Sequence, residues 1–217
     1  MKENDRSTLP KIRDYSRFDQ FLNSITPDVY PEPPREPHIT ITRTVIGKMR
    51  RENMIGPGDH ILDVGCGQGV ALEVFRELGM KATGITLGSD LDVCRTKGFD
   101  VHEMDQNFMS FPDGAFDVLW CRHVLEHSVA PFYTVAQYCR VSKPGGLIYV
   151  EVPAADTSAH HERGPNHYSI LPWTSWVNLF TRAGCTIERT DKIGFTALCG
   201  PDMYWSFFLR TPKLIGA

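Results

Sequence analysis

The chain has 217 residues, of which 41% are hydrophobic and 23% are charged, the proportions of an ordinary globular protein. Acidic residues outnumber basic ones by 26 to 23, so the formal net charge is −3 and we expect no nucleic-acid partner. The six cysteines form no Cys-x-x-Cys pair, and no apolar run approaches the ~20 residues that span a membrane. These features predict a soluble cytoplasmic protein with reduced thiols, without a signal peptide or a membrane segment.

The N-terminal part of the chain has its own pattern. Apolar residues at helical spacing between positions 15 and 25 predict a short amphipathic helix. The segment 27–37 contains five prolines, which fix φ and remove backbone donors, so we expect it to be extended. Helical spacing returns over residues 38–55. We therefore expect an N-terminal helical strap and Pro-rich linker over residues 1–57, followed by one domain over residues 58–217.

From residue 58 onward, short apolar runs alternate with amphipathic segments, which is typical of an α/β fold with a parallel sheet and helices on both faces. The last two predicted strands have no helix between them, so we expect the final strand to insert antiparallel. The seven predicted strands cover residues 60–64, 82–87, 100–104, 115–121, 147–152, 185–190 and 203–210, and the predicted helices cover residues 70–78, 90–97, 130–141 and 174–183.

The strongest motif is Asp63-Val64-Gly65-Cys66-Gly67-Gln68-Gly69, an acidic residue in an apolar strand followed by three glycines that lead into a helix. Glycines allow a tight bend and the close approach of a ligand, and the free N–H groups at the helix start offer polar contacts. In open α/β sheets, ligands bind beyond the carboxyl ends of the strands. A G-x-G-x-x-G dinucleotide motif would need glycine or alanine at position 70, where this chain has Val70. The motif therefore disfavours a nicotinamide oxidoreductase.

This D-x-G-x-G-x-G pattern resembles motif I of class I S-adenosylmethionine-dependent methyltransferases. Three later stretches resemble the small-molecule subgroup of that family in the right order: residues 105–117, the H-x-L-E-H pattern from His123 to His127, and Lys143-Pro144-Gly145-Gly146. The resemblance covers roughly residues 58–155. It implies a Rossmann-like, mostly parallel sheet, S-adenosylmethionine as cofactor, and methyl transfer to an unidentified small-molecule acceptor. A non-catalytic module that binds S-adenosylmethionine or S-adenosylhomocysteine is the alternative from another functional class.

The resemblance also implies the contacts of the cofactor. Asp63 and the glycine turn would hold its methionine end, and Asp105 would accept from the adenine amine. The family usually places a carboxylate at the end of the second strand, where it binds both ribose hydroxyls, but this chain has Thr86 there. Ser89 or Asp90 could share that contact, although Asp90 could equally be a helix N-cap. The predicted cofactor-binding residues are Asp63, Gly65, Cys66, Gly67, Gly69, Thr86, Leu87, Asp105, Gln106, Cys121 and Arg122.

Ionisable side chains concentrate in the predicted loop 155–170, which follows strand five on the side of the crevice. A histidine there could accept a proton near neutral pH, and Arg163 could hold an acidic substrate group. The sequence His160-His161-Glu162 lacks the i, i+4 spacing of helical metal ligands, so we predict no metal site. Glu126 and His127 are expected on a short helix, where they orient each other or the neighbouring backbone. The predicted catalytic residues are His160, His161, His167 and His123.

Overall fold

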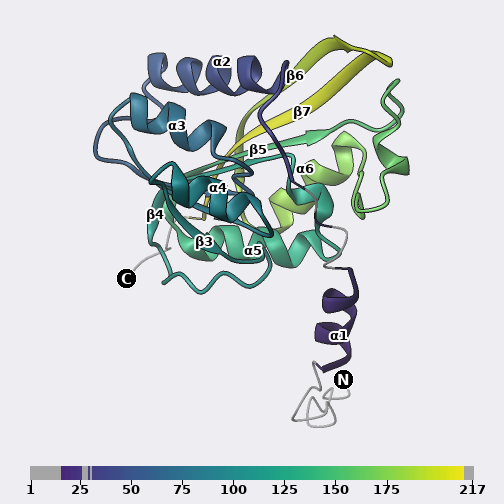
Figure 1. Cartoon of the computed structure of the whole chain (residues 1–217), viewed down its shortest axis with the longest axis horizontal. Helices are drawn as coiled ribbons and strands as arrows, with labels where there is room; N and C mark the ends of the chain where they lie inside the picture. Colours follow the sequence, from purple (N-terminus) through teal and green to yellow (C-terminus); the bar gives the residue numbers. More distant parts are fainter. Residues whose placement is uncertain (1–15, 26–28, 30, 213–217) are drawn as a thin grey trace, which may run out of the picture.

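The computed structural model describes residues 16–25, 29 and 31–212. The start of the predicted first helix at Tyr15, and the rest of the strap before it, lie outside the described residues. Seven strands form one sheet in the order β3-β2-β1-β4-β5-β7-β6 (Figure 1). The strands are β1 (His60–Val64), β2 (Lys81–Thr86), β3 (Asp100–Glu103), β4 (Phe116–Arg122), β5 (Ser142–Pro153), β6 (Thr186–Ala197) and β7 (Gly200–Arg210).

The sheet is parallel except for β7, which pairs antiparallel with both β5 and β6. This confirms the predicted seven-stranded, mostly parallel sheet with an antiparallel last strand. The order of strands changes direction at β1, whose neighbours are β2 and β4. A crevice opens beyond the carboxyl ends of strands at such a switch point. The glycine turn that follows β1 therefore lies where the topology places a ligand.

Helices cover both faces of the sheet, as predicted (Figure 1). Successive side chains of a strand point to opposite faces. Ile61 therefore joins Phe75 and Met49 in the cluster under α2 and α3, whereas Leu62 joins Trp176 and Tyr138 in the cluster under α5 and α6. The helices are α1 (Ser16–Ile25), α2 (His38–Arg51), α3 (Val70–Glu77), α4 (Asp90–Thr96), α5 (Pro131–Val141) and α6 (Trp173–Arg182), with short 3-10 helices η3 (Leu125–His127) and η4 (His161–Arg163).

The C-terminal hairpin is longer than its sequence pattern predicts. Strand β6 continues to Ala197, beyond the predicted end at residue 190. It is an edge strand whose side chains point alternately toward the protein and toward solvent, so it tolerates charged residues and glycine. Strand β5 is also longer, since its first residue, Ser142, pairs with Phe116 before the chain loops out and pairing resumes at Leu147. The predicted Lys143–Gly146 turn is therefore an irregularity within β5.

The N-terminal segments lie on different parts of this body. Helix α2 packs on α3 and buries Ile46 and Met49 completely, and an ion pair of 2.7 Å joins Arg43 to Glu77. Helix α1 projects from the body (Figure 1), and its Phe18 ring lies 6.4 Å from that of Phe108. None of the helices in the described residues has the length and apolar character needed to cross a membrane.

Candidate functional site

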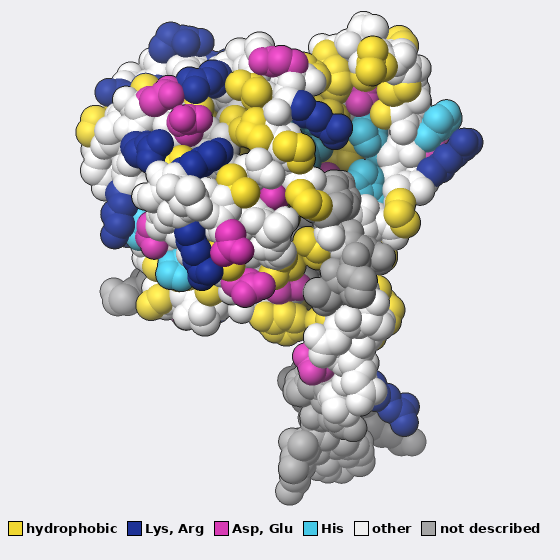
Figure 2. All heavy atoms as spheres, viewed as in Figure 1, with side chains coloured by type: hydrophobic (Ala, Val, Ile, Leu, Met, Phe, Trp, Pro, Cys, Tyr) yellow, Lys and Arg dark blue, Asp and Glu magenta, His cyan; other side chains and the backbone are white. Residues whose placement is uncertain are grey.

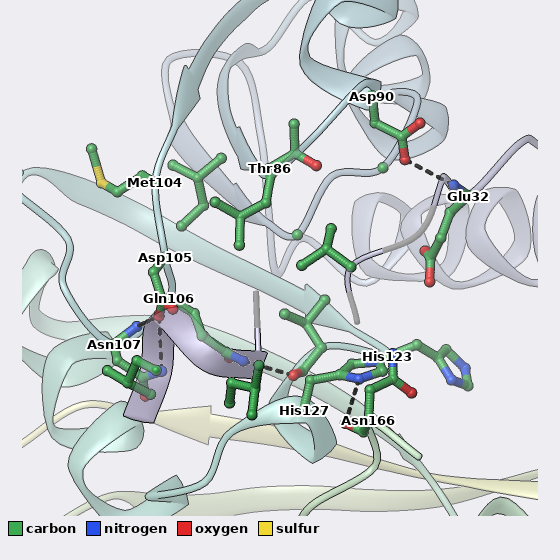
Figure 3. Close-up of a pocket in the computed structure, with 18 of the residues that line it drawn as sticks. Glu32, Thr86, Asp90, Met104, Asp105, Gln106, Asn107, His123, His127 and Asn166 are labelled. Carbon is green, nitrogen blue, oxygen red and sulfur yellow. Dashed lines mark hydrogen bonds between the residues drawn. The ribbon is translucent and has the colours of Figure 1, made fainter. Parts of the chain in front are cut away.

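A crevice of about 190 Å³ lies beyond the carboxyl ends of β1, β2 and β4. Its floor is formed by the carboxyl ends of these strands, and parts of α1, the Pro-rich segment and the loop after β5 surround it. Figure 3 shows the labelled side chains converging on this space, and Figure 2 shows histidine side chains gathered in a hollow of the surface. The lining residues are Leu22, Ile25, Val29, Glu32, Gly65, Gly67, Ile85, Thr86, Leu87, Asp90, Met104, Asp105, Gln106, Asn107, His123, Val124, His127, Asn166 and Tyr168.

The glycine turn has the backbone conformation that its sequence predicts. Gly65, Gly67 and Gly69 have φ values of 65°, 49° and 85°, in the left-handed region that favours glycine. A Cβ atom at Gly65 would lie 2.2 Å from a methyl group of Val124, and one at Gly69 would lie 2.7 Å from the Phe99 ring. The turn therefore requires glycine both for its conformation and for its close packing.

Six predicted cofactor residues line the crevice, and five lie behind its surface. Gly65, Gly67, Thr86, Leu87, Asp105 and Gln106 are lining residues, whereas Asp63, Cys66, Gly69, Cys121 and Arg122 are not. Among the second group, the Cys121 thiol lies 3.3 Å from the Tyr138 hydroxyl in the core, and Arg122 forms an ion pair of 2.6 Å with Glu151. These two side chains hold the end of β4 from opposite faces of the sheet.

Asp63 is almost fully buried, and its Oδ2 atom has no hydrogen-bond partner among the described residues. Burial raises the pKa of this carboxyl well above its usual range, and the Cys94 thiol adds to the effect. A buried carboxyl whose charged form is disfavoured, and which does not line the crevice, is poorly placed to bind a cationic ammonium group. The structure thus separates the motif's acidic residue from the crevice surface.

Asp90 does not act as the N-cap that the sequence allowed, because it is the first residue of α4 and Ser89 precedes it at the cap position. Its Oδ2 atom accepts a hydrogen bond of 2.8 Å from the Glu32 backbone N–H, and its Oδ1 atom accepts one of 3.0 Å from the Gln68 amide. Asp90 therefore ties the Pro-rich segment to the glycine turn (Figure 3).

This tie brings Glu32, which sequence reasoning missed, into the crevice. Its carboxyl points toward His123 (Figure 3), and its Oε2 atom lies 3.7 Å from the position of a Cβ atom built at Gly67. Burial raises the pKa of the Glu32 carboxyl, the positive charge of His123 opposes this, and the charges of Glu126 and Asp90 add to it. A glutamate in a proline-rich segment carries no sequence signal that would have identified it.

On the opposite side, the turn after β3 is held by its own hydrogen bonds. The Asp105 Oδ1 atom accepts bonds of 2.7 and 2.8 Å from the backbone and side chain of Asn107. Gln106 donates a bond of 2.8 Å to the Val124 carbonyl and accepts one of 2.6 Å from the Tyr138 hydroxyl. Gln106 thus braces the crevice wall through both ends of its amide, whereas the two bonds from Asn107 involve only one of the two carboxylate oxygens of Asp105.

His123 is held between two buried carboxylates at the end of β4. Its Nε2 atom lies 3.1 Å from Glu151 Oε1, and its Nδ1 atom lies 3.6 Å from Glu126 Oε1. Burial lowers the pKa of this imidazole, but the interactions with Glu126 and Glu151 outweigh it and the pKa is raised. The arrangement favours the protonated ring, which directs an N–H group toward each carboxylate and has no ring lone pair left to accept another proton.

The predicted loop histidines do not line the crevice. His160 is exposed, with its Nδ1 atom 3.3 Å from Glu162, and His161 bonds through Nε2 to Asp202 at 3.0 Å. His167 lies behind the surface, and its Nδ1 atom is 2.7 Å from the His161 carbonyl oxygen. The same loop reaches the crevice through Asn166 and Tyr168, and the H-x-L-E-H pattern contributes His127 as well as His123.

Comparison with known proteins gives the family. The chain matches a family described as a methyltransferase domain over residues 42–190. The ubiquinone biosynthesis O-methyltransferase of Methylococcus capsulatus is 36% identical over 100 residues, 42% of each chain. The 2-methyl-6-phytyl-1,4-hydroquinone methyltransferase of Synechocystis is 34% identical over 102 residues, which cover 43% of this chain and 32% of that protein. The matches thus span less than half of these curated relatives.

Solved structures agree on the fold. The [4+2]-cyclase SpnF superposes with a TM-score of 0.68 and 20% identity, over 94% of this chain and 98% of that one. A SAM-dependent methyltransferase from Aquifex aeolicus gives a TM-score of 0.61 and 16% identity, over 92% and 100% of the two chains. Since the matched family covers most of the sheet and its crevice, the chain belongs to the methyltransferase domain family and has the fold of class I methyltransferases, whose cofactor is S-adenosylmethionine.

Proposed function

We propose that this chain transfers the methyl group of S-adenosylmethionine to an oxygen atom of a small-molecule acceptor. The observation that carries the proposal is the crevice itself, in which a family-typical glycine turn, Thr86 and Asp105 line one continuous space. The names of the relatives support the acceptor class, because they describe O-methylation in ubiquinone biosynthesis and methylation of a hydroquinone.

The residues of the crevice suit the polar groups of the cofactor. Asp105 offers a carboxylate oxygen to the adenine amine, and the Thr86 hydroxyl is one partner for the ribose. Glu32, rather than Asp63, is the carboxylate at the surface beside Gly67, so we assign it to the methionine ammonium. A cation beside Glu32 would favour its charged carboxylate form, as the positive charge of His123 already does.

S-adenosylmethionine supplies a methyl carbon activated by a sulfonium, and its transfer is an in-line displacement. The work left to the protein is to align the acceptor and to exclude water. Apolar side chains from α1, Leu22 and Ile25, and Tyr168 from the loop after β5 close the crevice from outside. They suit an acceptor with an apolar body and a hydroxyl group, such as a hydroquinone or another hydroxylated aromatic compound.

The test combines a measurement of cofactor binding with a methyl-transfer assay. Calorimetry should show binding of S-adenosylmethionine and S-adenosylhomocysteine but no binding of NAD. Methyl-labelled cofactor should then label hydroquinones with a free hydroxyl, identified by mass spectrometry, and should not label matched compounds with both oxygens already methylated. Cofactor binding without transfer to any acceptor would support the binding-module alternative, and binding of NAD alone would overturn both interpretations.

A further inference from the structure

Three side chains beside the crevice form a group that the cofactor contacts do not use. Glu126 and His127 come from η3, directly after β4, and His167 comes from the loop after β5. One ligand atom of each lies within 4.8 Å of the other two. His127 also lines the crevice, beside Asn166 (Figure 3). The group, called here the 126/127/167 cluster, thus joins the end of β4 to the loop that covers the site.

Both imidazoles of the cluster are fixed in the same tautomer. The Nδ1 atom of His127 lies 2.9 Å from the carbonyl oxygen of Asn166, and the Nδ1 atom of His167 lies 2.7 Å from that of His161. A carbonyl oxygen only accepts, so each neutral ring carries its proton on Nδ1 and its lone pair on Nε2. Metal-binding histidines are typically oriented by a hydrogen bond of this kind from the second ring nitrogen.

Glu126 supplies the negative charge. It is 1% exposed, and its Oε2 atom has no hydrogen-bond partner among the described residues. Its Oε1 atom lies 3.6 Å from Nδ1 of His123, so only one of its two oxygens faces a partner of the opposite charge. A buried carboxylate with one unpartnered oxygen is expensive unless another group satisfies it, and a cation held by the two histidines would do so.

We propose that Glu126, His127 and His167 bind a divalent transition-metal ion, with Zn²⁺ as the best match to the donor set, and that the acceptor hydroxyl binds the same ion. Two imidazoles and one carboxylate are a ligand set of catalytic zinc sites, which keep a further position for water or substrate. Zinc bonds of about 2.1 Å place ligand atoms roughly 3.4 Å apart. Ligand atoms that lie within 4.8 Å of one another would therefore need to approach by little more than about an ångström to bind the ion. The assignment of the acceptor to this position rests on the proposed function.

The ion would promote deprotonation of the acceptor hydroxyl, a role for which His123 is not placed. Both ring nitrogens of His123 face carboxylates, Nε2 toward Glu151 and Nδ1 toward Glu126, so neither is placed to take the proton of an acceptor hydroxyl. A hydroxyl bound to a divalent ion loses its proton to solvent water more readily, because the ion stabilises the oxyanion. The oxyanion then forms the C–O bond as the C–S bond breaks and its electron pair returns to sulfur, which leaves a neutral ether and a neutral thioether.

The test uses Co²⁺, a spectroscopic substitute for Zn²⁺, on the full chain after treatment with a chelator. One equivalent of Co²⁺ should give the visible absorption of a site with nitrogen and oxygen ligands and should raise the Tm. His127→Ala, His167→Ala and the nearly isosteric Glu126→Gln should each weaken Co²⁺ binding at least ~100-fold, while circular dichroism confirms that they fold. His160→Ala is the matched control, since its ring is exposed in the same loop and it should bind Co²⁺ like the wild type.

Two results would overturn the proposal. The first is Co²⁺ binding to the wild type that is no tighter than to the cluster variants, or that His160→Ala weakens equally. The second is full methyl transfer by the metal-free protein, which would show that the acceptor hydroxyl does not need to bind the ion. Specific Co²⁺ binding with no methyl transfer from bound cofactor to any acceptor would support the metal site and count against the proposed function.

Discussion

The two walls of the crevice are assembled in different ways. One, the sheet wall, consists of the glycine turn 65–69, Thr86 and Asp105, which lie at or just after the carboxyl ends of the adjacent strands β1, β2 and β3. The other, the cover, brings Glu32 together with side chains from residues 127–168, across a large separation in sequence (Figure 3). The sheet wall depends on local backbone conformation, whereas the cover depends on tertiary contacts such as the bond from Glu32 to Asp90. Changes in the two walls should therefore have different consequences.

The largest effect is expected at the sheet wall. Gly65→Ala places a Cβ atom 2.2 Å from a methyl group of Val124 and forces a non-glycine residue to φ 65°. We expect the free energy of unfolding to fall by about 3 kcal/mol and cofactor affinity to fall at least ~100-fold. Urea denaturation and calorimetry measure the two quantities.

A matched control separates the clash from the backbone strain. Gly79 has a φ of 72° but no atom within 4 Å of its built Cβ, so Gly79→Ala should cost only about 1 kcal/mol and should leave cofactor binding intact. Adding Val124→Ala to the Gly65→Ala variant should recover part of the lost stability. Equal losses in the two alanine variants would show that the close packing at Gly65 is unimportant.

A smaller, binding-specific effect is expected in the cover. Glu32→Gln keeps the shape of the side chain but removes the charge assigned to the cofactor ammonium, so affinity for S-adenosylhomocysteine should fall about 10- to 50-fold. The fold should be unaffected, because Asp90 holds the Glu32 backbone rather than its side chain. Glu36→Gln, on the same segment but outside the crevice, is the control that should bind normally.

The pH dependence of the same titration sharpens this comparison. Burial raises the Glu32 pKa in the free protein, and a bound ammonium favours the carboxylate. Binding should therefore release protons, and affinity should increase as the pH rises through the raised pKa. Calorimetry in buffers of different ionisation enthalpy detects the release. The same proton release in Glu32→Gln would assign it to another group.

The sequence predicted the sheet wall well because its determinants are local. Three glycines after an apolar strand define the turn, and Asp105 stands at the equivalent position after β3. The cover was predicted only in outline. The loop 155–170 was expected over the crevice, but the side chains that reach it are Asn166 and Tyr168 rather than His167 between them or the two histidines, 160 and 161, that precede them. Which residues of an irregular loop face inward depends on its backbone path, and periodicity gives no information about that path.

Two other differences have the same origin. The predicted end of β6 at residue 190 is too early. The charged and glycine residues that follow suggest a loop unless the strand lies at the sheet edge, as β6 does. Glu32 could not be identified because its position depends on one hydrogen bond to Asp90, 58 residues away. Contacts of this kind have no signature within a single short segment.

The most direct test of the proposed site is a crystal structure of the chain with S-adenosylhomocysteine. We predict the ligand in the crevice, with its adenine amine at Asp105 and its amino group within hydrogen-bond distance of the Glu32 carboxylate. An amino group that instead contacts Asp63, with Glu32 displaced from Gly67, would contradict the role of the cover, and a ligand bound outside the crevice would contradict the account as a whole.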